Sequence, residues 1–313
     1  MSFDPIVSGS LSFLVVLILM ALNVPIGISM LVVGFTGFAL ITGFEQALFV
    51  LGTAPFEAVS KYTLSVLPLF VLMGNLANRA NLSRNLYDAA YAVVGHYKGG
   101  LAMSTVGACA GFGMICGSSI ATAATMSQMA GPEMKRHGYS DALISGSVAS
   151  GGTLGIIIPP SVILIIYAYL TEQSIQQLFF AALIPGLIAV VLYMIAIRVY
   201  LVIYPDQGGH GEKMTARDRI SALTKVFPIF LIFAIIMGGL YLGFFTATES
   251  AAVGVILVII FIFFRGELTI ELLRNSIWDT VKTVGALYLI VIGASVFNFL
   301  ITVTQLPLSL IHI

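Results

Sequence analysis

Charge is what this sequence has least of. Only 9% of its 313 residues are Asp, Glu, Lys or Arg, against about 25% in ordinary soluble domains. Acidic and basic residues balance at 14 each, so nothing indicates a nucleic-acid partner. Hydrophobic residues reach 59% and the mean hydropathy is +1.05. These values exclude a soluble domain and predict an all-α polytopic membrane protein in a lipid bilayer. The unbroken apolar runs also exclude a membrane β-barrel, whose strands alternate apolar and polar residues.

Cysteine and N-terminal positive charge are also scarce. Cys109 and Cys116 are the two cysteines, and no set of metal ligands surrounds them, so we interpret them as small packing residues. The N-terminus carries Asp4 and no basic segment, which argues against a cleaved signal peptide. The first apolar segment is therefore expected to stay in place as an anchor.

Two charge-free runs, at 99–132 and 142–171, are interrupted by residues that spoil helices. The first carries Gly-Ser-Ser at 117–119, and the second carries Gly-Gly-Thr at 151–153 and Pro-Pro at 159–160. Glycine costs about 1 kcal/mol and proline about 3 kcal/mol in a helix interior relative to alanine. In lipid, such breaks are tolerated only where the freed backbone is buried in protein or lines a wet cavity. Broken helices of this kind build the ion and substrate sites of many transporters.

Close helix packing with a proline kink is the alternative interpretation of the same two runs. Gly107 with Gly111, and Gly113 with Gly117, are small-xxx-small pairs that suit such packing. The presence of two breaks in one block, each with Ser or Thr, favours a site.

Further apolar runs and charged connectors extend over the rest of the chain. The apolar runs lie at 5–44 (with a break predicted at 23–27), 62–78, 179–197, 226–264 and 283–313. Amphipathic, charged segments lie at 45–61, 79–98 and 265–282, and the most polar segment, at 205–225, is the candidate cytoplasmic loop.

Glu249 is the sole ionisable residue inside the run 226–264. An acid within a membrane segment is a functional candidate. Alternatively, residues 246–250 form a turn at a helix start, where Thr, Ser and Glu are favoured. Both interpretations stay open at this point.

The order of features repeats along the chain. A break at 23–27 and another at 246–249 are each followed by an apolar run, an amphipathic segment and a span with a glycine, Gly74 or Gly293. This predicts an internal repeat, of the inverted type found in many transporters, whose second copy is incomplete within these residues.

Several blocks resemble the large membrane subunit (DctM type) of tripartite ATP-independent periplasmic (TRAP) transporters. They are 117–125, 132–134, 152–161, 68–74 and 245–252, and the similarity runs along the whole chain. The resemblance implies a sodium-coupled importer of an organic anion, such as a C4-dicarboxylate or sugar acid, and not an enzyme. It implies a multi-pass protein of the bacterial inner membrane that works with a small four-helix membrane subunit and a periplasmic substrate-binding protein. Na⁺ would be the coupling ion, with no organic cofactor.

The resemblance also implies an elevator-type motion and a division of the chain. Residues 1–98 would form scaffold helices and an amphipathic connector, and 99–171 the first re-entrant hairpin, with its tip at 117–119, and broken helix of the transport domain. Residues 172–225 would be a connecting span and polar loop, and 226–313 the start of the second repeat. Family members continue through a second hairpin and a second Pro-Pro segment, so we expect a C-terminal truncation after Ile313. Ala247 stands where the family usually has proline.

Sodium prefers oxygen ligands, and neutral ones can suffice for a single charge. We predict that it binds at the following residues: Gly117, Ser118, Ser119, Ser150, Gly152, Thr153 and Pro159. Binding there would pin the hairpin to the broken helix and organise the anion site, for which Ser119, Ser150 and Ser161 are the candidates. No other metal is expected. Alternatively, these hydroxyls bond to carbonyls of their own helices.

Rival functions differ in class. One is a sodium-coupled carboxylate carrier that needs no binding protein, and another is a non-transporting structural subunit. A third is an intramembrane serine enzyme using Ser150, but the histidines (His96, His137, His210 and His312) lie in connectors or at the terminus, away from it in sequence.

Overall fold

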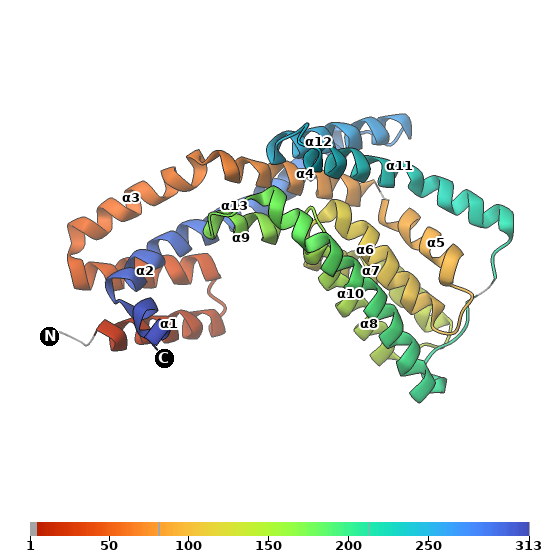
Figure 1. The fold of residues 1–313 in the computed structure, drawn as a ribbon, viewed down its shortest axis with the longest axis horizontal. Coiled ribbons are helices and arrows are strands. Elements are labelled where there is room, and N and C mark those ends of the chain that lie inside the picture. Colours follow the sequence, from red (N-terminus) through yellow and green to blue (C-terminus); the bar gives the residue numbers. More distant parts are fainter. Residues whose placement is uncertain (1–4, 81, 212, 313) are drawn as a thin grey trace. The chain divides into compact units, whose positions relative to one another are not determined.

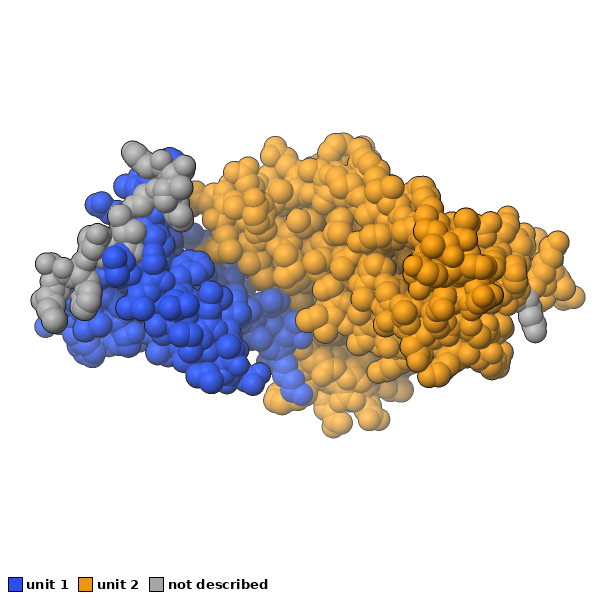
Figure 2. Space-filling view, turned by 90° about the horizontal axis from the view of Figure 1, so that it is seen from below, with its two compact units in different colours: residues 1–65, 281–313 blue, residues 66–280 orange. Residues whose placement is uncertain are grey.

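The computed structural model describes residues 5–80, 82–211 and 213–312, and this part of the chain is helical and contains no strand of a sheet. The all-α prediction is therefore confirmed for the described residues. The chain divides into two compact units, coloured separately in Figure 2: residues 1–65 with 281–313 (unit 1), and residues 66–280 (unit 2).

Unit 1 combines the two ends of the chain. Its helices are α1 (Pro5–Ala21), α2 (Ile26–Thr42), α3 (Phe44–Ser60), η1 (Tyr62–Ser65), the second part of α13 (Ile270–Val303) and α14 (Leu306–His312). The predicted break at 23–27 is confirmed, because α1 ends at Ala21 and Pro25 precedes α2. Asn23 turns the chain with a φ of 63°.

Helices α2 and α13 approach each other backbone to backbone within unit 1. A methyl group built on Gly34 would lie 2.7 Å from the backbone nitrogen of Phe297, and one on Gly27 would lie 2.7 Å from the carbonyl of Leu289. Small residues at such contacts let helices pack closely, which stabilises their association in lipid, where the hydrophobic effect does not drive helices together.

Unit 2 is built around a buried helix. Its elements are α4 (Val66–Arg79), α5 (Leu82–Val94), α6 (Gly100–Cys116), α7 (Ser119–Arg136), α8 (Asp141–Ile157), α9 (Val162–Leu170), α10 (Ile175–Ile203), η2 (Pro205–Gln207), α11 (Ala216–Tyr241), α12 (Ala247–Phe264) and the start of α13. Helix α6 buries 15 of its 17 residues, and α4, α5, α7, α8 and α10 surround it (Figure 1). A helix that is apolar on every side is expected to be enclosed in this way.

Several helices have the length and composition of membrane spans. Among the described residues, α10, α11, α12 and α13 qualify singly, and α8 with α9 qualifies as a pair bent by 47° at its break. The segment that continues from α3 into α4 forms a second such pair. This supports the predicted multi-pass membrane protein.

Two details refine the sequence interpretation. Most of the amphipathic segment 265–282 and of the apolar run after it form one helix, α13 (Ile270–Val303), in which no proline occurs. Thr246 and Glu249 form a capping box at the start of α12, where the Thr246 amide donates to the Glu249 carboxylate at 2.8 Å. This supports the helix-start interpretation of Glu249, and Ala247, at the first helical position, stands where proline is well tolerated.

The α2–α13 contact predicts different effects for two Gly→Ala changes in unit 1. Gly34→Ala should lower the apparent unfolding temperature in detergent, because its methyl group would overlap the backbone of Phe297, at a cost of about 1–3 kcal/mol. Gly52→Ala in α3 is the control, since nothing lies within 4 Å of the added methyl, and it should leave that temperature unchanged or raise it. Equal midpoints for the two variants would contradict the predicted backbone contact.

Candidate functional site

Helices α6 and α7 form a hairpin joined by two residues. Gly117 ends α6 in the left-handed region, with a φ of 62°, and its amide donates to the Gly113 carbonyl at 3.0 Å. Ser118 is extended, and its hydroxyl accepts from the Ala121 amide at 3.4 Å, which caps α7. Glycine at a helix end and serine at a helix start are the residues that such a reversal needs.

The second interruption separates α8 from α9 at Ile158–Ser161. Pro159 and Pro160 have no amide hydrogen to continue the helix. Ser161 is fully buried, and its hydroxyl accepts from the Leu164 amide at 3.4 Å to cap α9. The chain therefore restarts as a helix directly after the prolines.

The hairpin tip and this break lie against each other. The Val162 amide donates to the Gly117 carbonyl at 3.3 Å. A methyl group on Gly117 would lie only 2.7 Å from the Pro160 carbonyl. The two interruptions that the sequence singles out thus make one locked junction, called here the tip–break junction (residues 117–119 and 158–162).

Glycines bring α8 close to the first turn of α7. A methyl group on Gly155 would lie 2.8 Å from the Ser118 carbonyl, and one on Gly152 would lie 2.7 Å from Cβ of Ala123 and 3.3 Å from the Ser119 carbonyl. The carbonyls of Ser118 and Ser119 therefore face α8 at the junction.

The predicted site residues separate into two groups. Gly117, Ser118, Ser119, Pro159 and Ser161 belong to the tip–break junction, and Gly152 packs beside it.

Ser150 and Thr153 are directed elsewhere. The Ser150 hydroxyl donates to the Gly146 carbonyl at 2.7 Å. The Thr153 hydroxyl donates to the Ser150 carbonyl at 2.7 Å and lies 3.1 Å from the Tyr193 hydroxyl of α10. Because successive residues turn by about 100° around a helix, the Ser150 side chain lies on the face of α8 opposite Gly152, and Thr153 lies to one side of it, toward α10. For Ser150 and Thr153 the structure therefore shows the alternative given above, in which the hydroxyls bond to carbonyls of their own helix.

Helix α4 supports the junction from another side, which the sequence interpretation missed. A methyl group on Gly74 would lie 2.9 Å from the Cys116 carbonyl, the last residue of α6. The Thr125 hydroxyl of α7 donates to Asn78 Oδ1 at 3.2 Å. The signal that could have revealed this was a glycine and a polar amide inside the apolar run 62–78.

The cysteines fill space in this block, as the sequence interpretation proposed. Both are buried and form no disulfide, and Cys109 packs against Gly151 of α8.

The junction has polarity without formal charge. No charged residue occurs in 99–132 or 142–171. The N-termini of α7 and α9 and the C-termini of α6 and α8 converge there. Helix N-termini carry partial positive charge and C-termini partial negative charge. The arrangement can therefore attract an anion at one part and a cation at another.

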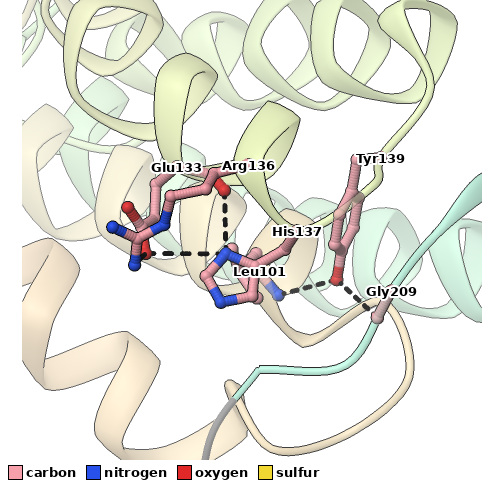
Figure 3. Close-up of polar contacts among 6 residues, drawn as sticks. All are labelled: Leu101, Glu133, Arg136, His137, Tyr139 and Gly209. Carbon is pink, nitrogen blue, oxygen red and sulfur yellow. Dashed lines mark hydrogen bonds and ion pairs between the residues drawn. The ribbon is translucent and has the colours of Figure 1, made fainter.

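The open end of the hairpin is anchored by hydrogen bonds (Figure 3). The Tyr139 hydroxyl accepts from the Leu101 amide at 3.2 Å and donates to the Gly209 carbonyl at 3.0 Å. Burial raises the pKa of Tyr139 to about 12, so this hydroxyl stays protonated at neutral pH. Glu133 pairs with Arg136 at 3.1 Å, and His137 Nδ1 lies 2.9 Å from the Glu133 backbone carbonyl and 3.5 Å from its carboxylate. The hairpin is thus held at both ends.

Comparison with known proteins shows similarity over nearly the whole chain. Residues 13–313 match the family model described as the tripartite ATP-independent periplasmic transporter, DctM component. The C4-dicarboxylate TRAP transporter large permease protein DctM of Pseudomonas aeruginosa is 35% identical over 256 residues, which cover 82% of this chain and 60% of the relative.

Other relatives have different named substrates. The ectoine/5-hydroxyectoine TRAP transporter large permease protein UehC of Ruegeria pomeroyi is 30% identical, over 94% of this chain and 69% of its own length. The sialic acid TRAP transporter large permease protein SiaM of Vibrio cholerae is 31% identical, over 80% of this chain and 58% of its own length. The matches thus span about three fifths of the curated relatives. Since the family model covers nearly every residue, the chain belongs to the DctM component family of tripartite ATP-independent periplasmic transporters.

Proposed function

We propose that this chain acts as the membrane subunit of a sodium-coupled secondary transporter that imports an organic anion across the bacterial inner membrane. The observation that carries the proposal is the tip–break junction, where the Val162 amide meets the Gly117 carbonyl. Interrupted helices that meet in this way are how many transporters build ion and substrate sites. The names of the relatives, which include C4-dicarboxylate and sialic acid transporters, support a carboxylate substrate.

The same proposal includes the partners. A periplasmic binding protein would deliver the anion, and a small four-helix membrane subunit would complete the transporter. The family name and the names of the relatives, which are large permease proteins of TRAP transporters, support these partners.

Sodium would bind at the junction through neutral oxygens. Carbonyls of Gly117, Gly152 and Pro159 and hydroxyls of Ser118 and Ser119 are the nearest candidates, and oxygen is the ligand that hard cations prefer. Ser150 and Thr153 stay in the proposed set. Because their hydroxyls already bond within α8 and toward Tyr193, we expect substitutions there to change the sodium dependence of uptake less.

The anion would use the positive ends of helices. Ser118 and Ser161 cap the N-termini of α7 and α9, and Ser119 opens α7. Such N-termini bind carboxylates through backbone amides without a charged side chain. Ser119, Ser150 and Ser161 remain the proposed contacts.

Movement of residues 99–171 as one body would give an elevator mechanism. The close packing of α6, α7 and α8 supports such a body. In this proposal 1–98 and 226–313, the start of the second repeat, supply scaffold helices, and 172–225 is a connecting span and polar loop.

A carboxylate carrier that needs no binding protein is the second candidate. Uptake by the complete permease in proteoliposomes, with and without the binding protein, separates the two. We expect uptake only in the presence of that protein, and equal uptake in its absence would favour the carrier.

The junction predicts a position-specific effect of alanine at two left-handed glycines. Gly117→Ala and Gly138→Ala both place alanine at positive φ, 62° and 76°, a strain of about 1–2 kcal/mol. Only the methyl of Gly117→Ala also overlaps the Pro160 carbonyl, whereas nothing lies within 4 Å of that of Gly138→Ala. We expect Gly117→Ala alone to lower substrate uptake, by about tenfold or more. Equal uptake by both variants would show that the tip need not contact the break.

Loss of a junction hydroxyl should change sodium dependence. Ser118→Ala and Ser119→Ala should each raise the sodium concentration for half-maximal uptake by about tenfold, since each removes one proposed ligand. Ser140→Ala is the control for lost capping, because the Ser140 hydroxyl caps α8 by accepting from the Leu143 amide at 3.3 Å. It should lower stability and leave sodium dependence unchanged. An unchanged sodium requirement in both junction variants would argue against sodium at the tip.

A further inference from the structure

A polar cavity lies at the other end of α7 from the tip. Four side chains of α5, Arg84, Tyr87, Asp88 and Tyr91, recur at i, i+3, i+4 and i+7 and so share one helix face. They line a cavity of about 540 Å³ together with residues from the last turns of α7 and with Met214. Within this stripe Arg84 and Asp88 are exposed, whereas Tyr87 is buried.

Tyr87 gives this cavity an unsatisfied donor. Its side chain is only 7% exposed, and its hydroxyl has no hydrogen-bond partner in the described part of the chain. Burial, with the nearby charge of Glu133 adding to it, raises the pKa of Tyr87 well above its usual range, so the hydroxyl stays protonated. A buried donor without a partner is costly, and an acceptor in the cavity would remove that cost.

The charges around Tyr87 are mixed. Glu133 is already paired with Arg136. Arg84 and Asp88, one helical turn apart, form no direct ion pair in the described residues. Arg84 and Tyr87 are donors and Asp88 beside them is an acceptor, which the charge of Lys225 in α11 also reaches. This balance disfavours a ligand of one charge sign.

We propose that this cavity binds a small zwitterion that joins an oxyanion to a primary ammonium group. Arg84 and Tyr87 donate hydrogen bonds to the oxyanion, and Asp88 accepts from the ammonium. The phosphoethanolamine headgroup of a membrane lipid has this chemistry, as does the same group in a water-soluble molecule. The site is independent of the transport proposal.

The test uses glycerophosphoethanolamine as a soluble probe. Calorimetric titration into the complete permease, purified in detergent without phosphatidylethanolamine, should show saturable binding. Tyr87→Phe and Arg84→Gln should each weaken it by about tenfold or more, because each removes a donor to a charged group. Tyr241→Phe is the matched control: its hydroxyl is also buried without a partner in the described residues but lies outside the cavity lining. It should bind the probe like the unaltered protein.

Thermal unfolding separates lost binding from lost folding. Without probe, Tyr87→Phe should unfold at no lower temperature than the unaltered protein, since it removes an unsatisfied hydroxyl. With probe, the midpoint should rise in the unaltered protein and in Tyr241→Phe, and stay unchanged in Tyr87→Phe.

The ammonium group is tested with glycerophosphocholine, which has no N–H donor. It should bind about tenfold more weakly, and Asp88→Asn should abolish this preference. Competition by phosphatidylethanolamine nanodiscs, but not phosphatidylcholine nanodiscs, would identify the lipid as the source, and no competition would identify a soluble zwitterion. The proposal is overturned by absent saturable binding, by equal binding in Tyr87→Phe, or by equal affinity for the choline probe.

Discussion

Backbone groups freed in apolar surroundings are the constraint on which this structure depends. Each helix interruption leaves amides and carbonyls without partners inside the helix, and lipid offers none. In this chain two interruptions satisfy one another: the Gly117 carbonyl accepts from the Val162 amide, and the hydroxyls of Ser118 and Ser161 cap the helices that begin there. The junction therefore holds together without any charged side chain.

Close packing of the surrounding helices follows from the same constraint. The junction forms only if α8 reaches the first turn of α7, and Gly152 and Gly155 allow this because they have no Cβ to collide with it. Helix α6 behind them is buried on nearly every side and also relies on small residues. By contrast, the fully buried residues of α7 form a single stripe, Thr122, Met126, Ala130 and Met134.

Residues of one chemical type have different roles according to the helix face they occupy. Ser118 and Ser161 lie at helix starts, where their hydroxyls satisfy backbone amides at the junction. Ser150 and Thr153 lie inside α8 on the face toward α10, and their hydroxyls bond to carbonyls of the same helix. A serine or threonine in an apolar run therefore indicates a site only once its face is known.

Local chemistry was enough to predict where the helices stop. Gly117, the Pro159–Pro160 pair and the break at 23–27 act through their own backbone conformation, so the sequence alone determined those interruptions and the membrane class. The tertiary structure decided which interruptions meet, that Gly74 of α4 supports the end of α6, and that the polar face of α5 lines a cavity with α7. These contacts join residues far apart in the chain, and their register depends on how whole helices pack, which no local pattern specifies.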